Sequence, residues 1–431
     1  RIDRLGSDER AVIQDAAVLG QSFTLDGLAA LSDRSEDDLK LIVSQLVRDE
    51  IFHYDDDPRS PERGQHKFVQ SVIREVAYGR LARGDRKRRH VAVAHHYEGD
   101  GAVEFAAIVA DHYMKALEIE PDEALAALAR ASMLAAAQRA FDLHSHRQAL
   151  SLVRRGLVIP GEDAGRVPLW ELGALAASNV YEGEAALGMA RDALGWHEEH
   201  GTSDGAVRAA RICGYVLSSL DRPVDALEVM GPHFVPGAAD PEMRELGAEL
   251  ARAHMLAGNS QASADVARDT MVAAEAAGDL EVVVETLNTR GTVLTSLGRL
   301  HEALALLSGA VGLAAELDSP VAELRALNNY GVTAAAQGLR SEPRVALRFS
   351  ELTQRLGIFD FQLRGMNWQA EEWRGRGDFF QAVALYEDFE ISPTSTWGRV
   401  LGADALISRW ALTNDDTFLE EAMRDVSEVP V

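Results

Sequence analysis

The chain of 431 residues is poor in cysteine, lysine and aromatic residues. Its only cysteine, Cys213, excludes a disulfide within the chain and any metal site built from several cysteines. A nucleotide-binding P-loop ends in Gly-Lys, but none of the four lysines (Lys40, Lys67, Lys87 and Lys115) follows a glycine. The sequence also lacks a run of about 18 apolar residues, the length that spans a membrane. These absences predict a protein of the reducing cytoplasm, with no membrane contact and no P-loop of its own.

Acidic residues dominate the charge. The chain has 68 Asp and Glu against 43 Lys and Arg, a formal net charge of −25. Because nucleic-acid binding needs a basic face, we expect no nucleic-acid partner. Acidic pairs occur throughout and single out no acid–base couple, and no His group offers a third ligand for a metal. We therefore expect no catalytic residue, no metal and no cofactor held by this chain alone.

A hairpin of two amphipathic helices recurs along the chain. Its clearest copy runs from Gly291 to Ala310, with a turn at Gly298. A small residue of the first helix recurs in register at Ala137, Ala176, Gly214, Ala251, Gly291, Gly331 and Ala370. A turn residue recurs in the same register at His144, Gly183, Asp221, Gly258, Gly298, Gly338 and Gly377. We further expect Pro343 to begin its helix and a last unit to run from about Trp397 to Ser427.

This pattern resembles the tetratricopeptide family in its longer form of about 39 residues per repeat. It looks like the sensor arrays of bacterial signalling ATPases and of regulators of the maltose-activator type. The resemblance covers residues 122–431 and implies an all-α fold of about 7–8 repeats. A single hairpin cannot bury its apolar stripe, so the hairpins stack into a superhelix with a concave face.

The first hundred residues are close to neutral, with 16 Lys and Arg against 19 Asp and Glu. Their pattern predicts a helix over residues 8–19, a turn and short helix over 23–31, and a helix N-capped by Ser35 that ends near Asp49. Two short aromatic or β-branched segments, 51–54 and 65–69, predict a β-hairpin. This order indicates a small winged-helix domain over residues 1–80, joined to the array by linking helices over 81–121.

A second resemblance rests on the run Ile73-Arg-Glu-Val-Ala-Tyr78, on His90 after a basic helix, and on the pair His112-Tyr113. These segments look like the region that follows the ATPase core in bacterial STAND signalling ATPases, of the kind fused to class III adenylate/guanylate cyclases or LuxR-type regulators. The match covers about residues 8–155. It implies that ATP or ADP binds in an upstream domain, and that the chain is a regulatory part of a longer protein.

Gln70 departs from this family, which has histidine at that position. In related ATPases a winged-helix histidine contacts the nucleotide phosphates. Gln70 can donate a hydrogen bond but cannot carry a positive charge, and Arg74 is the nearest cation, one helical turn away. The resemblance thus implies Gln70 and Arg74 as weak nucleotide-sensing candidates. Basic residues 80–89 either contact phosphate or an acidic partner, or form a solvated helix face.

Asparagines on the first helices of two adjacent repeats are the candidate ligand-binding residues. Similar repeats use asparagine on the concave face to hydrogen-bond a peptide backbone; the alternative is hydrogen bonding between repeats. The candidate set is Asn288, Arg290, Asn328, Asn329 and Tyr330.

Two functions follow. The first is a non-catalytic module of a signalling ATPase that senses a ligand or protein, clasped to an upstream ATPase domain of the same chain. The alternative is a constitutive scaffold that binds a partner protein or peptide without nucleotide control. Because the first residue is Arg and a helical pattern begins within ten residues, we expect an internal fragment or a processed product. Oligomerisation on activation stays open.

Overall fold

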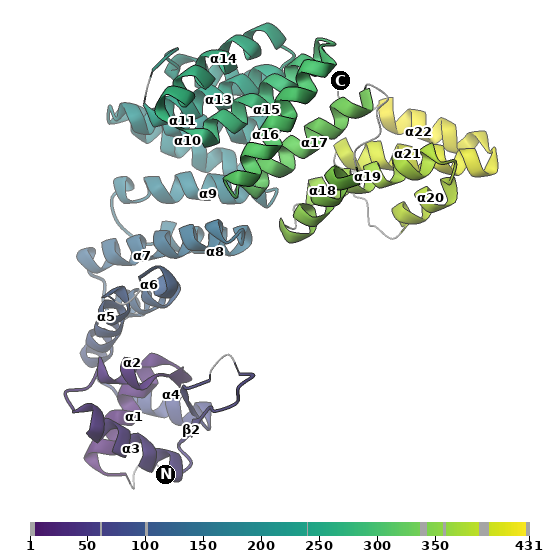
Figure 1. Ribbon diagram of the computed structural model, residues 1–431. Coiled ribbons are helices and arrows are strands. Elements are labelled where there is room, and N and C mark those ends of the chain that lie inside the picture. Colours follow the sequence, from purple (N-terminus) through teal and green to yellow (C-terminus); the bar gives the residue numbers. More distant parts are fainter. Residues whose placement is uncertain are drawn as a thin grey trace. The chain divides into compact units, whose positions relative to one another are not determined.

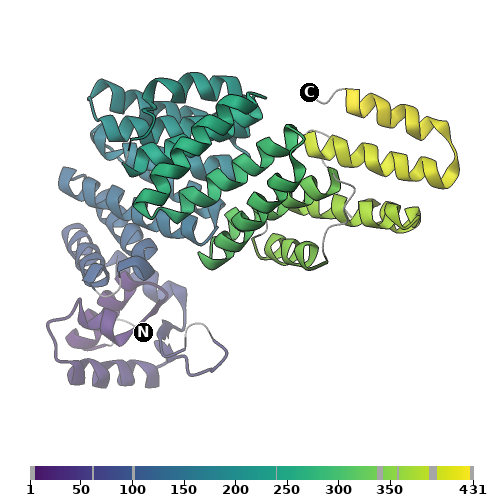
Figure 2. The ribbon, with the colours of Figure 1, turned by 45° about the horizontal axis from the view of Figure 1, so that its top comes forward.

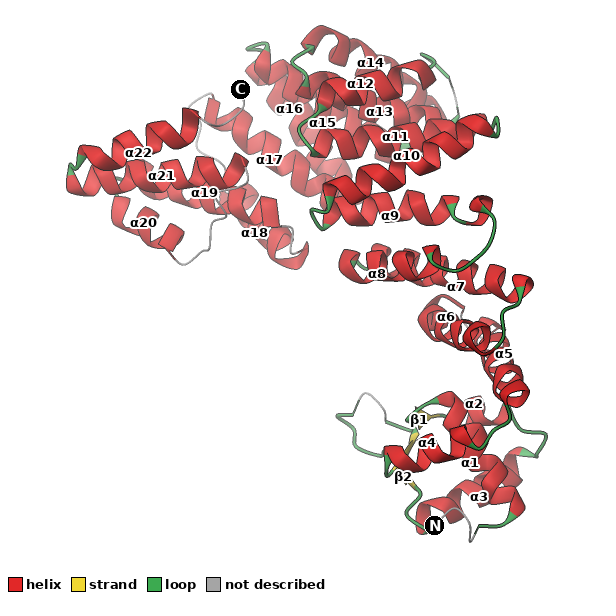
Figure 3. Ribbon diagram, turned by 180° about the vertical axis from the view of Figure 1, so that it is seen from behind, coloured by secondary structure: helices red, strands yellow, loops and turns green. Residues whose placement is uncertain are grey.

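The structure, a computed structural model, describes residues 5–60, 63–99, 102–238, 240–336, 343–356, 359–387 and 396–427. Apart from three short strands, its regular elements are helices, as Figure 3 shows. They fall into two compact units, Arg1–Leu220 and Asp221–Val431. Within the described ranges no helix is long and apolar enough to cross a membrane.

The N-terminal part of the first unit combines four helices with a small antiparallel sheet. Its elements are α1 (Ser7–Leu19), β1 (Ser22–Phe23), α2 (Leu25–Ala29), α3 (Glu36–Arg48), β2 (Phe52–Tyr54), β3 (His66–Phe68) and α4 (Ser71–Gly79). The predicted helices and the β2–β3 hairpin are confirmed. The sequence did not predict β1, which pairs with β3 so that the strand order is β1-β3-β2.

One aromatic residue from each strand fills the centre of this part. Phe52 contacts Phe23 edge-to-face at 4.9 Å between ring centroids and Phe68 at 5.0 Å. Strand residues alternate between faces, so short strands suffice to place these rings over α1 and α3. Ser35 accepts a hydrogen bond from the backbone N–H of Asp38 at 3.2 Å, which confirms the predicted N-cap of α3.

Helical hairpins follow without a break in packing. In the first unit they are α5 (Arg83–Gly99), α6 (Ala102–Ile119), α7 (Glu123–Asp142), α8 (His146–Leu157), the short η2 (Asp163–Gly165), α9 (Val167–Asn179), α10 (Gly183–Glu199) and α11 (Ser203–Ser219). Each helix packs against the next, and α6 packs against α7 as extensively as neighbours in the array do. The predicted domain boundaries at 80/81 and 121/122 stay predictions.

The second unit continues the same arrangement (Figures 1 and 2, teal to yellow). Its helices are α12 (Pro223–Met230), η3 (Gly231–His233), α13 (Pro241–Leu256), α14 (Ser260–Ala277), α15 (Leu280–Ser296), α16 (Leu300–Glu316), α17 (Pro320–Ala336), α18 (Pro343–Leu356), α19 (Phe359–Gly375), α20 (Phe379–Glu387), α21 (Thr396–Thr413) and α22 (Asp416–Ser427). The predicted array of helical hairpins is confirmed, including the helix start at Pro343 and the last hairpin.

The small residues of the repeat lie in the core. All seven predicted positions are buried. A Cβ atom added at Gly291 would lie 2.6 Å from Leu307 Cγ, and one at Gly331 would lie 2.2 Å from the ring of Trp368. These positions are small because a neighbouring helix occupies the space of a side chain.

The turn register is wrong at one position. His144, Asp221, Gly258, Gly298 and Gly377 have the positive φ of a left-handed turn, as the register predicts. In the second repeat, however, Tyr181 has it (φ 65°), and Gly183 is the first residue of α10. A Cβ at Gly183 would lie 2.3 Å from Leu220 Cδ2, so glycine is needed there for packing and not for the turn. Gly338 lies outside the described residues.

Candidate functional site

The first helices of successive hairpins line one side of the array in each unit. In the second unit α13 contacts α15, and α15 contacts α17. Among the described residues no comparable contact joins the second helices α14 and α16. Since the first helices approach one another more closely, they lie on the inner, concave side of the arc. We call the inner face the stripe of Glu285, Asn288 and Thr292 on α15 and of Arg325, Asn328, Asn329 and Val332 on α17, which helical spacing places on one side of each helix.

Three asparagine amides form a hydrogen-bonded relay across the inner face. Asn328 Nδ2 donates to Asn329 Oδ1 at 3.1 Å, and Asn329 Nδ2 donates to Asn288 Oδ1 at 3.0 Å. Asn288 is 8% exposed and Asn328 is 4% exposed. Among the described residues Asn288 Nδ2 and Asn328 Oδ1 have no partner. The relay therefore ends in one unpaired donor and one unpaired acceptor, the two groups that a peptide bond also offers.

Contacts on either side of the relay hold α15 and α17 in register. Arg325 forms an ion pair with Glu285, and Thr295 Oγ1 lies 2.7 Å from Thr333 Oγ1. Val332, beside them, is 49% exposed. The relay is thus carried on two helices that are tied together, which reduces the entropy lost when a ligand binds.

The other two predicted residues of this site lie elsewhere on their helices. Arg290 Nη1 points to Met271 Sδ of α14, at 3.9 Å, and does not contact the asparagines. Two residues after Asn288, it lies roughly 200° away from that side chain around the helix. Tyr330 occupies the corresponding position of α17 and is partly exposed. The structure therefore brings together the three asparagines and leaves Arg290 and Tyr330 on another side.

The two nucleotide-sensing candidates lie at the start of α4. Gln70 is the exposed N-cap residue, and its side chain makes no capping hydrogen bond. Arg74 is partly buried, and its Nε donates to the backbone oxygen of Ala17 at 3.4 Å. Arg74 thus fixes α4 against the end of α1, while Gln70 is the more accessible of the two.

The basic cluster that follows is engaged within the chain. Arg83 donates to the backbone oxygen of Ile119. Lys87 pairs with Glu120 at 3.2 Å, and Arg89 pairs with Asp15 at 2.7 Å. The cluster therefore attaches α5 to α1 and to the end of α6. Neither sequence interpretation, a phosphate or partner contact or a solvated helix face, included this packing role.

Two buried histidines connect α5 to α6. His90 Nδ1 lies 2.9 Å from His112 Nδ1, and Tyr78 Oη lies 2.9 Å from His90 Nε2. Burial lowers the pKa of His90 to about 3 and that of His112 to about 4. Burial is the largest cause, the nearby Lys115 contributes to both shifts, and Asp111 opposes them. The sequence singled out these residues through a family resemblance, and it gave no sign that they touch.

One segment matches a serine-hydrolase motif, which the expectation of no catalytic residue did not take into account. Residues 201–205 read Gly-Thr-Ser-Asp-Gly, a Gly-x-Ser-x-Gly pattern. That motif normally joins a strand to a helix, whereas here it joins helices α10 and α11. Ser203 Oγ donates to Asp204, and the nearby His197 instead contacts Thr202 and Glu171. The segment lacks the serine–histidine contact of a nucleophile.

Metal and thiol chemistry have no site in the described part of the chain. Its residues contain no cluster of three or more His, Cys, Asp or Glu side chains suited to a metal. Cys213 is buried, and burial raises the pKa of its thiol to about 12. A thiol in that state is not a nucleophile at neutral pH.

The fold defines the chain as a tetratricopeptide-like helical-repeat protein. No protein family and no curated protein sequence matches it.

Several solved structures are similar at 10% sequence identity. One is a Rap protein complexed with competence and sporulation factor, with a TM-score of 0.47 over 96% of this chain and 100% of that one. Another is aspartyl phosphate phosphatase F from Bacillus subtilis, with a TM-score of 0.49 over 91% of this chain and 96% of that one. A STAND protein with a tetratricopeptide-repeat sensor from Pyrococcus horikoshii gives 0.37 over 99% of this chain and 64% of that one. At this distance the likeness concerns the helical-repeat fold and not function.

Proposed function

We propose that the chain is a regulatory module that binds a peptide or protein segment on its inner face. The observation that carries this proposal is the asparagine relay with its unpaired end groups. A backbone N–H of a bound segment pairs with Asn328 Oδ1, and a backbone C=O pairs with Asn288 Nδ2. Both end groups belong to side chains that packing holds in place, so a ligand that pairs with them finds the donor and the acceptor already positioned.

Selection from a random peptide library, followed by affinity measurement, tests this binding. Asn329→Ala interrupts the relay, so the selected peptides should bind it about tenfold more weakly. Asn179→Ala, at an exposed asparagine of α9, serves as the matched control and should leave affinity unchanged. Melting curves of both variants verify that each is folded. Equal affinity of the wild-type chain and folded Asn329→Ala would refute binding at the relay.

The N-terminal part fits a winged helix that packs on a nucleotide-binding core. Three helices precede a β-hairpin, the order typical of such domains. Beside the two nucleotide-sensing candidates, Val69, Val72 and Val76 are 49%, 62% and 41% exposed. Such a row of exposed valines favours burial against another domain. In this proposal ATP or ADP binds upstream, and the chain itself is not an enzyme.

A signal switches such a protein only if it binds its closed and open states with different affinity. The coding DNA upstream of the Arg1 codon decides whether a switch exists. A P-loop there supports the signalling ATPase. A start codon close upstream, with no ATPase core, supports the second candidate, a constitutive scaffold. The uncharged and exposed Gln70 favours that second candidate, because it cannot neutralise phosphate.

A further inference from the structure

Helix α8 has a charge pattern opposite to that of the chain. Its 12 residues include Arg147, Arg154 and Arg155 and no carboxylate. Acidic residues outnumber basic ones 68 to 43 in the whole chain. The three arginines lie on one side of the helix, since residues seven and eight apart share a face.

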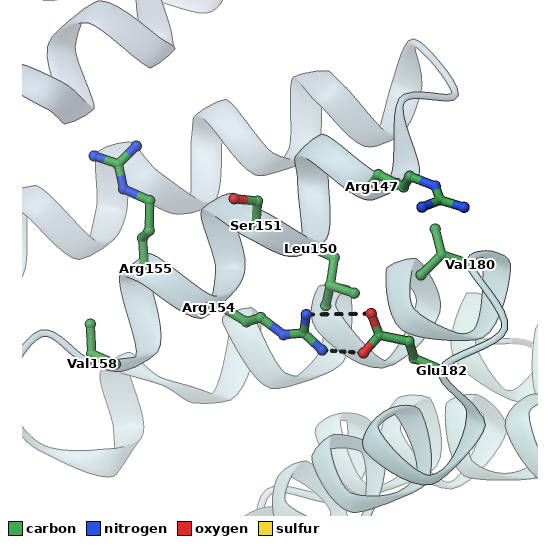
Figure 4. Close-up of a pocket in the computed structure, with 8 residues that line it drawn as sticks. All are labelled: Arg147, Leu150, Ser151, Arg154, Arg155, Val158, Val180 and Glu182. Atoms are coloured by element: carbon green, nitrogen blue, oxygen red, sulfur yellow. Dashed lines mark hydrogen bonds and ion pairs between the residues drawn. The ribbon is translucent and has the colours of Figure 1, made fainter.

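This side of α8 borders a groove that the turn between α9 and α10 closes (Figure 4). The groove has a volume of about 510 Å³ and is lined by Arg147, Leu150, Ser151, Arg154, Arg155, Val158, Val180 and Glu182. Figure 4 shows Arg147 beside Val180 at one end and Arg155 near the other end, with Arg154 between them. Leu150 is 2% exposed at the base, whereas Val158 is 76% exposed.

The groove already holds one carboxylate. Both terminal nitrogens of Arg154 donate to Glu182, a two-pronged pairing that Figure 4 marks with dashed lines. The other two arginines are less engaged. Arg155 lies 3.7 Å from Asp111, beyond the distance of a good hydrogen bond, and Arg147 has no partner among the described residues. Two guanidinium groups at opposite ends can thus donate hydrogen bonds to further carboxylates.

We propose that this groove binds an extended acidic peptide segment, independently of the inner face. Eight helical residues separate Arg147 from Arg155, a distance of about 12 Å. An extended chain covers about 3.3 Å per residue, so two acidic residues four positions apart match this distance. Side chains at positions one, three and five of an extended segment share a face. The middle one therefore points to the apolar base at Leu150 and is expected to be apolar.

Three fluorescein-labelled peptides distinguish this segment from simple charge attraction. The first repeats Glu-Ser-Leu-Ser and presents Glu, Leu and Glu on one face. The second repeats Glu-Leu-Ser-Ser, which has the same composition but places Leu on the opposite face. The third repeats Glu-Ser-Ser-Ser and lacks the apolar side chain. Fluorescence anisotropy gives the affinity of the full chain for each at low and at physiological salt.

The first peptide should bind at least fivefold more tightly than the other two, with an affinity that falls as salt rises. Arg147→Glu should weaken its binding about tenfold. Arg299→Glu makes the same charge change at an exposed arginine before α16 and should leave the affinity unchanged. Val158→Ser should reduce the preference for the first peptide over the third. Melting curves show that each variant is folded.

Three results would overturn the proposal. If all three peptides bind alike, the groove attracts charge and does not recognise a segment. If Arg147→Glu and Arg299→Glu bind the first peptide equally, or if the wild-type chain does not bind it at low salt, the groove is not the site. Asn329→Ala, which tests the inner face, should not affect this binding, so the two proposals succeed or fail separately.

Discussion

Acidification should loosen the packing of α5 against α6, because the His90–His112 pair must stay uncharged in the folded chain. The two Nδ1 atoms are 2.9 Å apart, and only one hydrogen fits between them. Two imidazolium ions would each carry a hydrogen on Nδ1, so double protonation breaks this contact. Both side chains are also at most 3% exposed, which disfavours even one charge.

The sign and size of the effect follow from the lowered pKa values. The unfolded histidines bind protons below a pKa of 6.5, whereas the folded pKa values are about 3 for His90 and about 4 for His112. As the pH falls below 6.5, the two histidines bind protons in the unfolded chain before they do so in the folded chain. The folded state therefore loses stability progressively until the pH reaches the folded pKa values. At pH 5 the loss is about 2 kcal/mol per histidine.

Hydrogen exchange followed over α4–α6 measures this loss locally. His112→Asn retains a polar atom near the position of Nδ1 but does not titrate. Between pH 7 and pH 5 the wild-type opening free energy should fall by about 2 kcal/mol more than that of the variant. NMR of the labelled imidazoles provides a direct check, because the His90 and His112 signals should move by no more than about a tenth of a full titration between pH 7 and pH 5. Signals that titrate near pH 6.5, or equal losses in both proteins, would refute the reasoning.

Two further predictions concern buried small residues. Gly291→Ala should destabilise the second unit by about 1–3 kcal/mol, because the added Cβ would lie 2.6 Å from Leu307. The control is Gly309→Ala in α16, where the added Cβ meets open space; it should stabilise the unit by up to about 1 kcal/mol. Urea unfolding compares them, and equal effects would show that the Gly291 contact is absent. Cys213 should resist a disulfide reagent at pH 8 in the native chain and react fully in denaturant, since its thiol is buried with a pKa raised to about 12; rapid native labelling would contradict this.

The helical repeats were predictable because burial imposes a regular pattern. A helix that crosses another closely needs a small residue at each crossing, and the sequence repeats it seven times. The turn at Tyr181 was not predictable from the same pattern, because Gly183 satisfies the expected spacing for a different reason, its contact with Leu220. Glycine marks both a left-handed turn and a close packing contact, and the sequence alone does not distinguish them.

The candidate sites were less predictable than the fold. The asparagines were predicted because they recur on neighbouring first helices. The same spacing did not show that the side chain of Arg290 points to α14. The α8 groove was not predicted, because its arginines are spread over nine residues and lie beside Glu182 only in the folded chain. The sequence showed only the dense basic cluster at residues 80–89, where Lys87 and Arg89 pair within the chain.

The extent of the asparagine relay follows from the repeat. Equivalent residues of α15 and α17 are 40 positions apart, and the ties between the two helices join residues 38, 40 and 41 apart. The same step back from Asn288 reaches Ala248 of α13, which has no side-chain amide.

In the other direction the repeat leads to Trp368 of α19, at the position of Asn329. Its ring packs on Phe349 at 4.6 Å and belongs to the core. On the α13 side Ala248 ends the row of amides, whereas on α19 Asn367 lies at the position of Asn328 and its Nδ2 donates to Glu371 Oε1 at 3.4 Å. The two end groups of the relay match one or two peptide units of a bound segment. Affinity beyond that must come from flanking side chains such as Val332 and from the ion pair of Glu285 with Arg325.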